Sequence, residues 1–199
     1  MNADSQTEIL LTVCIPSLPE RMASLAELVA VLRGQDCPEL EVLVLMDNRR
    51  RHLGEKRNAM IRMARGKFIA NVDDDDLVTG DYFAKLRDAL REDVDVVGHD
   101  ALCSLNGSPM FLVRTGLDFP NEQPRHRSEG GYHDIRRTFW HWCAWRRELA
   151  LQCPFPEDCN DGAEDARFLE QALPRVRTWR KVDEALFIHR YWANRTTFG

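Results

Sequence analysis

The chain has 199 residues, of which 44% are hydrophobic and 30% are charged, and this balance is ordinary for a soluble globular protein. The length is sufficient for one domain with a sizeable core. The formal net charge of −5 gives no indication of a nucleic acid or an anionic membrane as a partner. The polar stretch 1–8 lacks the features of a signal peptide, and no apolar run approaches the ~20 residues of a spanning helix. We therefore expect a cytoplasmic protein with reduced cysteines.

The first half of the chain alternates predicted strands with predicted helices. Apolar, β-rich runs predict buried strands over 9–15, ending before Pro16, and over 40–46, 67–72 and 94–97. Apolar residues at helical spacing predict helices over 21–33, 54–65 and 82–90. This alternation indicates right-handed βαβ units, an α/β class and a mainly parallel sheet with helices on both faces. Such sheets bind ligands at the carboxyl ends of their strands, which here carry Pro16-Ser17, Asp47-Asn48 and the aspartates 73–76.

The second half of the chain has a less regular pattern. Asn106-Gly107 between the runs 101–105 and 110–113 predicts a β-hairpin. Residues 119–134 are rich in Pro, Gly and charge, and we expect a mobile loop there. The aromatic run 139–142 precedes a short helix that ends near Leu151. A loop over 153–162, a helix over 164–173 and a strand over 182–189 complete the predicted order.

Four consecutive aspartates, 73–76, follow the third predicted strand. Four carboxylates at one strand end repel one another and are costly to desolvate as a group. A divalent cation such as Mg²⁺ or Mn²⁺ would relieve that cost, because hard cations prefer oxygen ligands. The alternative is an exposed acidic turn whose aspartates cap a helix and suit its dipole. The run by itself leaves both interpretations open.

Taken in order, these segments resemble the GT-A glycosyltransferases of the family 2 type. The segments 13–17 with Arg21, 43–48 and 54–58 are similar to the opening strand and turn, the second strand and the second helix start of that family. Asp73-Asp74-Asp75 matches its metal-binding Asp-x-Asp, and Glu164-Asp165 resembles its base motif. The resemblance is strongest over 9–97. It implies one GT-A domain, in which 9–97 binds the nucleotide sugar and 98–199 forms a small mixed acceptor-binding half.

The family resemblance also implies a reaction: metal-dependent, inverting transfer of a sugar from a nucleotide diphosphate, of the UDP-sugar type, to an acceptor hydroxyl. Asp75 would ligate Mn²⁺ or Mg²⁺ directly, Asp73 would act through water or hold the ribose, and His189 would complete the metal site. Asp165, preceded by Glu164, would remove the acceptor's proton. Alternatively, His189 is a buried histidine, and the two acids of 164–165 merely suit a helix dipole.

The nucleotide is expected to lie at the polar strand ends, with Asp47 accepting a hydrogen bond from a uracil-type imide. Its predicted contacts are Pro16, Ser17, Glu20, Arg21, Asp47, Lys56, Arg57, Asn58, Asp73 and Asp74. Several of these charges could instead belong to a solvated helix face. Within the acidic run, we expect Asp76 to cap a helix and Asp74 to be a solvated neighbour. Trp140, Trp142 and Trp192 are candidates for a stacking platform, or for the core.

Two other functions compete with this one. Residues 74–78 fit the Asp-x-Asp-x-Val pattern of a haloacid-dehalogenase-type phosphohydrolase with Asp74 as nucleophile, although two βα units precede the motif. An EF-hand is excluded, because Val78 and Ala84 stand where Gly and Glu belong. The acceptor is expected to be a glycan or a small molecule. The alternative acceptor is a hydroxylated base in DNA, held by arginines of the second half and flipped out of the helix.

Overall fold

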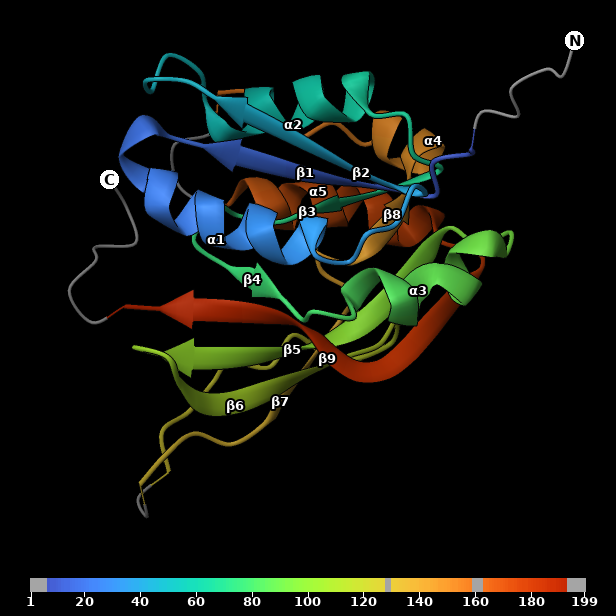
Figure 1. The fold of residues 1–199 in the computed structure, drawn as a ribbon. Helices are drawn as coiled ribbons and strands as arrows, with labels where there is room; N and C mark the ends of the chain where they lie inside the picture. The colour runs from blue at the N-terminus through green and yellow to red at the C-terminus, as the bar shows by residue number, and fades with distance from the viewer. Residues whose placement is uncertain (1–6, 128–129, 159–162, 193–199) are drawn as a thin grey trace, which may run out of the picture.

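The computed structural model describes residues 7–127, 130–158 and 163–192. These residues form one mixed β-sheet covered by helices (Figure 1). The elements are β1 (Leu11–Ser17), α1 (Met22–Arg33), β2 (Leu40–Met46), α2 (Leu53–Met63), β3 (Phe68–Asn71), β4 (Leu77–Val78), α3 (Tyr82–Arg91), β5 (Val96–Leu105), β6 (Ser108–Thr115), β7 (Ile135–Arg137), β8 (Ala144–Arg146), α4 (Arg147–Leu151), α5 (Glu164–Ala172) and β9 (Trp179–Tyr191). The predicted α/β class is confirmed.

The first part of the sheet is parallel. β1 pairs with β2 on one side and with β3 on the other, both in parallel register. The crossover from β1 to β2 and the crossover from β2 to β3 therefore run in opposite directions across the sheet. Because such crossovers are right-handed, α1 and α2 lie on opposite faces of the sheet, as Figure 1 shows. The carboxyl ends of the three strands meet at one edge.

β2 is the edge strand of this part, and the prediction that it is buried is wrong. Val44 and Met46 are 42% and 37% exposed. A wholly apolar run fits a buried strand and an edge strand equally well, and only the pairing partners distinguish the two. A smaller difference concerns β1, which continues through Pro16 to Ser17 in register with β2. Residue 17 is therefore held by the sheet rather than by a turn.

The second part of the sheet is mixed. β8 pairs antiparallel with both β3 and β5 and so joins the two halves. β5 also pairs antiparallel with β6 and parallel with β9, while β9 pairs with β4. The predicted strand 94–97 and the run 101–105 belong to one strand, β5. The prediction separated them because His99 and Asp100 between them are polar, yet both are buried. The predicted boundary between 97 and 98 therefore falls inside one strand.

The predicted hairpin at Asn106-Gly107 is confirmed. Both residues have positive φ, 50° for Asn106 and 83° for Gly107, and they join β5 to β6. This backbone conformation explains the residue types, since asparagine and glycine tolerate it best. In the described part of 119–134 the chain is irregular, with an isolated bridge between His126 and Tyr132. Whether this segment is mobile stays a prediction.

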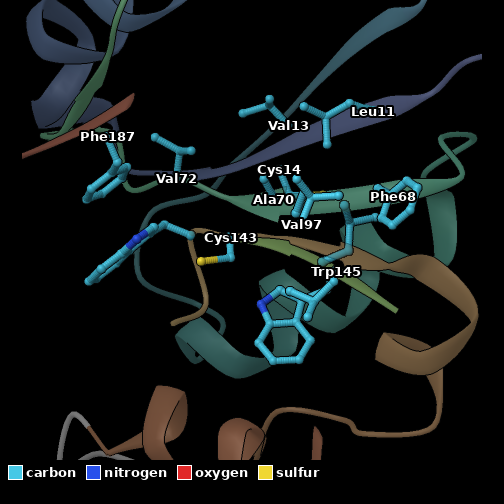
Figure 2. Packing of buried hydrophobic residues seen from close by; sticks show 14 of the residues in the cluster. Leu11, Val13, Cys14, Phe68, Ala70, Val72, Val97, Cys143, Trp145 and Phe187 are labelled. Atoms are coloured by element: carbon cyan, nitrogen blue, oxygen red, sulfur yellow. The ribbon is translucent and has the colours of Figure 1, made fainter. Parts of the chain in front are cut away.

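The hydrophobic core lies on both sides of the central strands. Figure 2 shows Val13, Ala70 and Val97 from β1, β3 and β5 close together, with Trp145 below them and Phe187 next to Val72 on the left. Trp145 is fully buried, and its indole nitrogen donates to the Trp140 carbonyl at 2.9 Å. The five cysteines of the described residues are free thiols, while Cys159 lies outside those residues. This core fixes the strand ends on which the polar residues stand.

None of the helices in the described ranges combines the length and the apolar composition that crossing a membrane requires.

Candidate active site

The end of β2 is tied to the end of β1 by a buried lysine. Lys56, which is 4% exposed, lies 2.6 Å from Asp47 Oδ1 and donates to the Ser17 carbonyl at 3.0 Å. Burial alone would raise the pKa of Asp47, but the hydrogen bond and charge of Lys56 outweigh it and hold the pKa below its usual range. The Arg51 amide donates to the other oxygen of Asp47 at 2.9 Å. Lys56 thus belongs to the site and not to a solvated helix face.

Asp74 connects β1 to the acidic run, and the expectation that it is solvated is wrong. It is 1% exposed, and it accepts hydrogen bonds from Ser17 Oγ at 2.6 Å and from Arg21 Nη1 at 2.9 Å. Its carboxylate is therefore fully engaged in holding the first turn. Glu20 points away from this contact and pairs with Arg49 at 2.5 Å on the exposed surface.

Asp76 does not cap a helix, contrary to expectation. It is 2% exposed and accepts a hydrogen bond from the Arg190 amide of β9 at 2.8 Å. His189 Nδ1 lies 3.0 Å from the same oxygen. Burial opposes the charged form of His189, but Asp76 outweighs it and raises the pKa of His189 above its usual value. α3 begins only at Tyr82, so Asp76 is too far from it to be its N-cap. Asp76 instead binds Arg190 and His189 of β9.

Asp75 is the member of the run without a dedicated buried partner. Its side chain is 28% exposed, and Arg21 Nη1 lies 3.2 Å away. Burial and the charges of Asp73, Asp76 and Asp74 raise the pKa of Asp75 to about 6, while Arg21 opposes that rise. The ionised form of Asp75 is therefore under-compensated by the protein, and added positive charge would stabilise it.

Arg57 is fully buried and links the acidic run to α5. Its Nη2 donates to Asp73 at 2.9 Å, and its Nη1 donates to Asp165 and to Glu164, the latter at 3.5 Å. Burial alone would raise the pKa of Asp73, but Arg57 holds it below its usual range. The guanidinium also lies over the Phe155 ring, 5.2 Å from its centroid. One buried cation thus binds three carboxylates from two distant segments of the chain.

Asp165 combines burial with access from solvent. Its side chain retains 18% exposure, and burial raises its pKa to about 6 against the opposing charge of Arg57. His141 Nδ1 lies 3.0 Å from Asp165 Oδ2. Burial, with a further contribution from Arg57, lowers the pKa of His141 to about 3, so this imidazole is neutral at pH 7. Near neutral pH the pair is an ionised carboxylate beside a neutral histidine.

No sequence motif indicated a role for His141. Its only signal was its place in the aromatic run 139–142, and its partner lies more than twenty residues further on. The neighbouring Trp142 is 7% exposed and stacks on Phe187 with ring centroids 4.9 Å apart, so it belongs to the core. Trp140 is half-buried and remains available to a ligand.

Asn58 and Gly54 position the segment that precedes α5. The Asn58 amide donates to the Phe155 carbonyl at 2.8 Å and to Glu157 at 2.9 Å, and its oxygen accepts from the Phe155 amide. A Cβ at Gly54 would lie 1.9 Å from the Pro156 carbonyl oxygen. These contacts place Asn58 beneath the site, where it supports Asp165 indirectly. The predicted loop continues into 159–162, outside the described residues.

The structure thus brings most predicted site residues to one edge of the sheet. Ser17, Arg21 and Asp74 form one linked group, Asp47 and Lys56 a second, and Arg57 joins Asp73 to the acids of α5. The proposed metal ligands Asp73, Asp75 and His189 do not form a ready-made cage. Across the described ranges, no three His, Cys, Asp or Glu side chains are arranged to hold a metal ion. A cation here would need further ligands from water or a bound substrate.

Similarity to known proteins covers both the sequence and the fold. The family model "Glycosyl transferase family 2" matches residues 41–148, which is more than half of the chain. The chain is 30% identical over 156 residues to the "Uncharacterized glycosyltransferase EpsJ" of Bacillus subtilis (strain 168), a match that covers 73% of this chain and 44% of EpsJ. The chain therefore spans less than half the length of this curated relative.

Among solved structures, the fold is similar to residues 1–349 of TarS from S. aureus in complex with UDP-GlcNAc. The TM-score is 0.64 at 18% identity, with 91% of this chain and 58% of that chain covered. A mannosyltransferase from Pyrobaculum calidifontis, PcManGT, in complex with GDP-Man and Mn²⁺, gives a TM-score of 0.55 at 16% identity, covering 89% of this chain and 56% of that one. At these identities the likeness shows the GT-A fold alone. By its match to the family model, the chain belongs to glycosyl transferase family 2.

Proposed function

We propose that this chain transfers a sugar from a nucleotide diphosphate, of the UDP-sugar type, to an acceptor hydroxyl with inversion at the anomeric carbon. The observation that carries the proposal is the buried bridge of Arg57 between Asp73 and Asp165. It joins the acidic strand end, where a donor diphosphate would lie, to a carboxylate suited to act as base. The complex of TarS with UDP-GlcNAc supports a UDP-type donor by analogy of fold.

In this mechanism Asp165 is the general base. Its carboxylate takes the proton of the acceptor hydroxyl while that oxygen bonds to the anomeric carbon. The bond between the anomeric carbon and the diphosphate oxygen breaks, and the diphosphate leaves with the electron pair. Arg57 fixes the orientation of the Asp165 carboxylate, and the neutral His141 lies beside it. A single displacement from the face opposite the leaving group inverts the configuration. Glu164 contributes negative charge beside Arg57 and has no direct part in the transfer.

A divalent cation, Mn²⁺ or Mg²⁺, fits the donor side of this site. Asp75 has an under-compensated, partly exposed carboxylate, and Asp73 offers a second oxygen ligand at 30% exposure. Such cations are commonly held by one or two carboxylates together with substrate phosphates, which agrees with the lack of a protein-only cage in the described residues. When bound, the cation would neutralise the charge of the leaving diphosphate. His189, paired with Asp76, would orient that side of the site.

The nucleotide base would lie beside Pro16 and Ser17. Lys56 and the Arg51 amide hold the Asp47 carboxylate at the edge of this position, where Asp47 could accept a hydrogen bond from a uracil imide. Arg21, which is 35% exposed and already bound to Asp74, is placed to meet a phosphate oxygen. Arg57 faces carboxylates on both sides and orients the site instead of contacting the nucleotide.

A thermal-shift panel tests this proposal. UDP, GDP, CDP and ADP are each added with and without Mn²⁺, with Mg²⁺ as the second metal. A ligand at ~100 times its dissociation constant should stabilise the fold by about 2.7 kcal/mol, and we expect UDP with metal to give the largest shift. Asp75→Ala should remove the metal-dependent part of the shift. The proposal fails if no nucleotide gives a metal-dependent shift.

The competing phosphohydrolase hypothesis is wrong, because the chain belongs to a glycosyltransferase family. Asp74 is also buried and held by Ser17 and Arg21, so it is not free to act as a nucleophile.

We propose a glycan or a small molecule as acceptor. One observation favours the alternative of a hydroxylated base in DNA: an open groove of about 560 Å³ at the β6–β7 edge, whose lining includes Arg114, Arg125 and Arg136. Glu122 and Asp134 in the same lining reduce its positive charge. Duplex affinity that falls steeply with salt would support the DNA acceptor.

We further propose a cytoplasmic location and a single domain, in which 9–97 binds the donor and the remainder binds the acceptor. Cell fractionation and limited proteolysis, respectively, would test these two statements.

A further inference from the structure

Arg137, the last residue of β7, is a half-buried cation that forms no ion pair with the residues the structure describes. Its Nε donates to the Glu122 carbonyl at 3.3 Å, and its guanidinium lies over the Trp140 ring, 5.3 Å from the centroid. In the part of the chain that the structure describes, no carboxylate is within ion-pair distance of Arg137, and its two terminal nitrogens have no hydrogen-bond acceptor. A partly buried cation without a carboxylate partner would be stabilised by an added anion.

Trp140 places this guanidinium close to the proposed base. The Trp140 ring lies 6.3 Å from the ring of its neighbour His141, measured between centroids. His141 in turn lies 3.0 Å from Asp165. Trp140 and its neighbour His141 therefore connect Arg137 to Asp165 through successive contacts.

The charge of Arg137 also acts on residues of β5 and β9. Its charge acts on Tyr191 and on Cys103, and it opposes the rise that burial causes in the pKa of each. Tyr191 lies edge-on to His189 at 4.4 Å between ring centroids, and Cys103 is paired with His189 in the register of β5 and β9. Arg137 thus faces the same part of the molecule as His189 and Asp165, although β7 lies at the far edge of the sheet (Figure 1).

The acids that face this region are already engaged. Asp76, which also acts on Tyr191 and Cys103, is bound to His189 and to the Arg190 amide. Glu122 bonds through its carboxylate to Arg136, and only its backbone carbonyl reaches Arg137. The fork of donors on Arg137 is therefore open to a ligand oxyanion.

We propose that Arg137 binds an oxyanion, phosphate or carboxylate, carried by the acceptor close to its reacting hydroxyl. This inference rests on the proposed function and narrows the acceptor to a negatively charged molecule. The planar guanidinium suits bidentate recognition of either group, and the half-exposed Trp140 ring beneath it limits its freedom. The neutral His141 beside Asp165 adds no competing positive charge.

The test compares three small probes on protein saturated with UDP and Mg²⁺, so that the donor diphosphate site is already filled. Glycerol is the neutral probe, glycerol 3-phosphate carries the phosphate, and glycerate carries the carboxylate. Calorimetric titration measures each affinity in the wild type and in three variants: Arg137→Gln, Arg137→Lys and the control Arg87→Gln. Arg87 is an exposed arginine on α3, remote from the site. UDP affinity in each variant reports whether the donor site is intact.

We expect at least one anionic probe to bind about tenfold or more tightly than glycerol, as charge-assisted bidentate contacts allow. Arg137→Gln should abolish this preference, Arg137→Lys should keep part of it, and Arg87→Gln should keep all of it. The tighter of the two anionic probes identifies the preferred group. A preference that survives Arg137→Gln, or no preference in the wild type, overturns the inference. If the wild type does not bind UDP, the proposed function fails, and the same titration without UDP still decides the role of Arg137.

Discussion

Each of the four consecutive aspartates has a different partner, and the partners determine what each residue does. Asp73 is bound to Arg57, Asp74 to Ser17 and Arg21, and Asp76 to β9. Asp75 faces the repulsion of the other three with only a shared contact to Arg21. The sequence predicted the run as a site, but the roles expected for Asp74 and Asp76 were wrong, because their partners lie tens of residues away. For the same reason, the sequence did not predict that His141 lies beside Asp165.

The difference between Asp74 and Asp75 predicts opposite effects on stability. Asp74→Ala removes the shorter hydrogen bond of the buried Ser17 hydroxyl and the closer of the two carboxylates beside Arg21, and should destabilise the fold by about 1–3 kcal/mol. Asp75→Ala removes a carboxylate that its neighbours repel, so stability at pH 7 should be unchanged or higher in metal-free buffer. Urea unfolding with EDTA present measures both variants. Equal destabilisation by the two substitutions would contradict these assignments.

The raised pKa of Asp165 predicts the pH dependence of transfer. Burial raises this pKa from 3.8 to about 6, and a protonated carboxyl cannot accept the acceptor's proton. The rate should therefore be level above pH ~7 and fall about tenfold per unit once the pH is well below 6, as expected for one essential base. Since the pKa of Asp75 is also about 6, kcat is measured with saturating donor and metal, so that metal binding does not contribute. An acid limb near pH 4 would mean that Asp165 is not the base.

At the scale of elements, local pattern was sufficient where each strand or helix is uniform. β2 and β6, the hairpin turn and the helices of the first half were predicted within a few residues. β5 was divided in two, because Gly98, His99 and Asp100 interrupt its apolar pattern. His99 and Asp100 are buried there, and Asp100 accepts a hydrogen bond from the Thr115 amide of β6 at 2.9 Å. The hydrogen bond that compensates the burial of Asp100 comes from another strand, so the residues next to Asp100 in the sequence do not reveal it.

The start of α2 supplies a prediction at this scale. Gly54→Ala should raise helix propensity, yet its Cβ would meet the Pro156 backbone oxygen at 1.9 Å, so we expect a net loss of about 1–3 kcal/mol. Because that contact positions the segment before α5, the rate of transfer should fall as well. Gly80→Ala is the matched control, since nothing lies within 4 Å of a Cβ there. Equal stability of the two variants in thermal unfolding would show that the backbone at Pro156 moves aside at little cost.

At the scale of the whole molecule, the sheet brings a donor edge and a base together from distant parts of the chain. β1, β2 and β3 supply the polar strand ends, and α5 supplies Asp165 (Figure 1). β8 joins β3 to β5, and β9 pairs with β4 and contributes His189. The order of motifs in the sequence predicted this convergence. The geometry of the Arg57 bridge could not be predicted from the sequence, because it depends on how α2, β3 and α5 pack.

The most direct test of the central claim is the release of UDP from a panel of UDP-sugars, with water as a slow acceptor, by the wild type and by Asp165→Asn. The asparagine keeps the shape of the side chain but cannot accept a proton. We predict metal-dependent UDP release by the wild type and a decrease of about 10²–10⁴-fold in the variant, with UDP affinity retained. Glu170→Gln, an exposed position on the same helix, should match the wild type. Unchanged release by Asp165→Asn would contradict the account, as would no release from any nucleotide sugar.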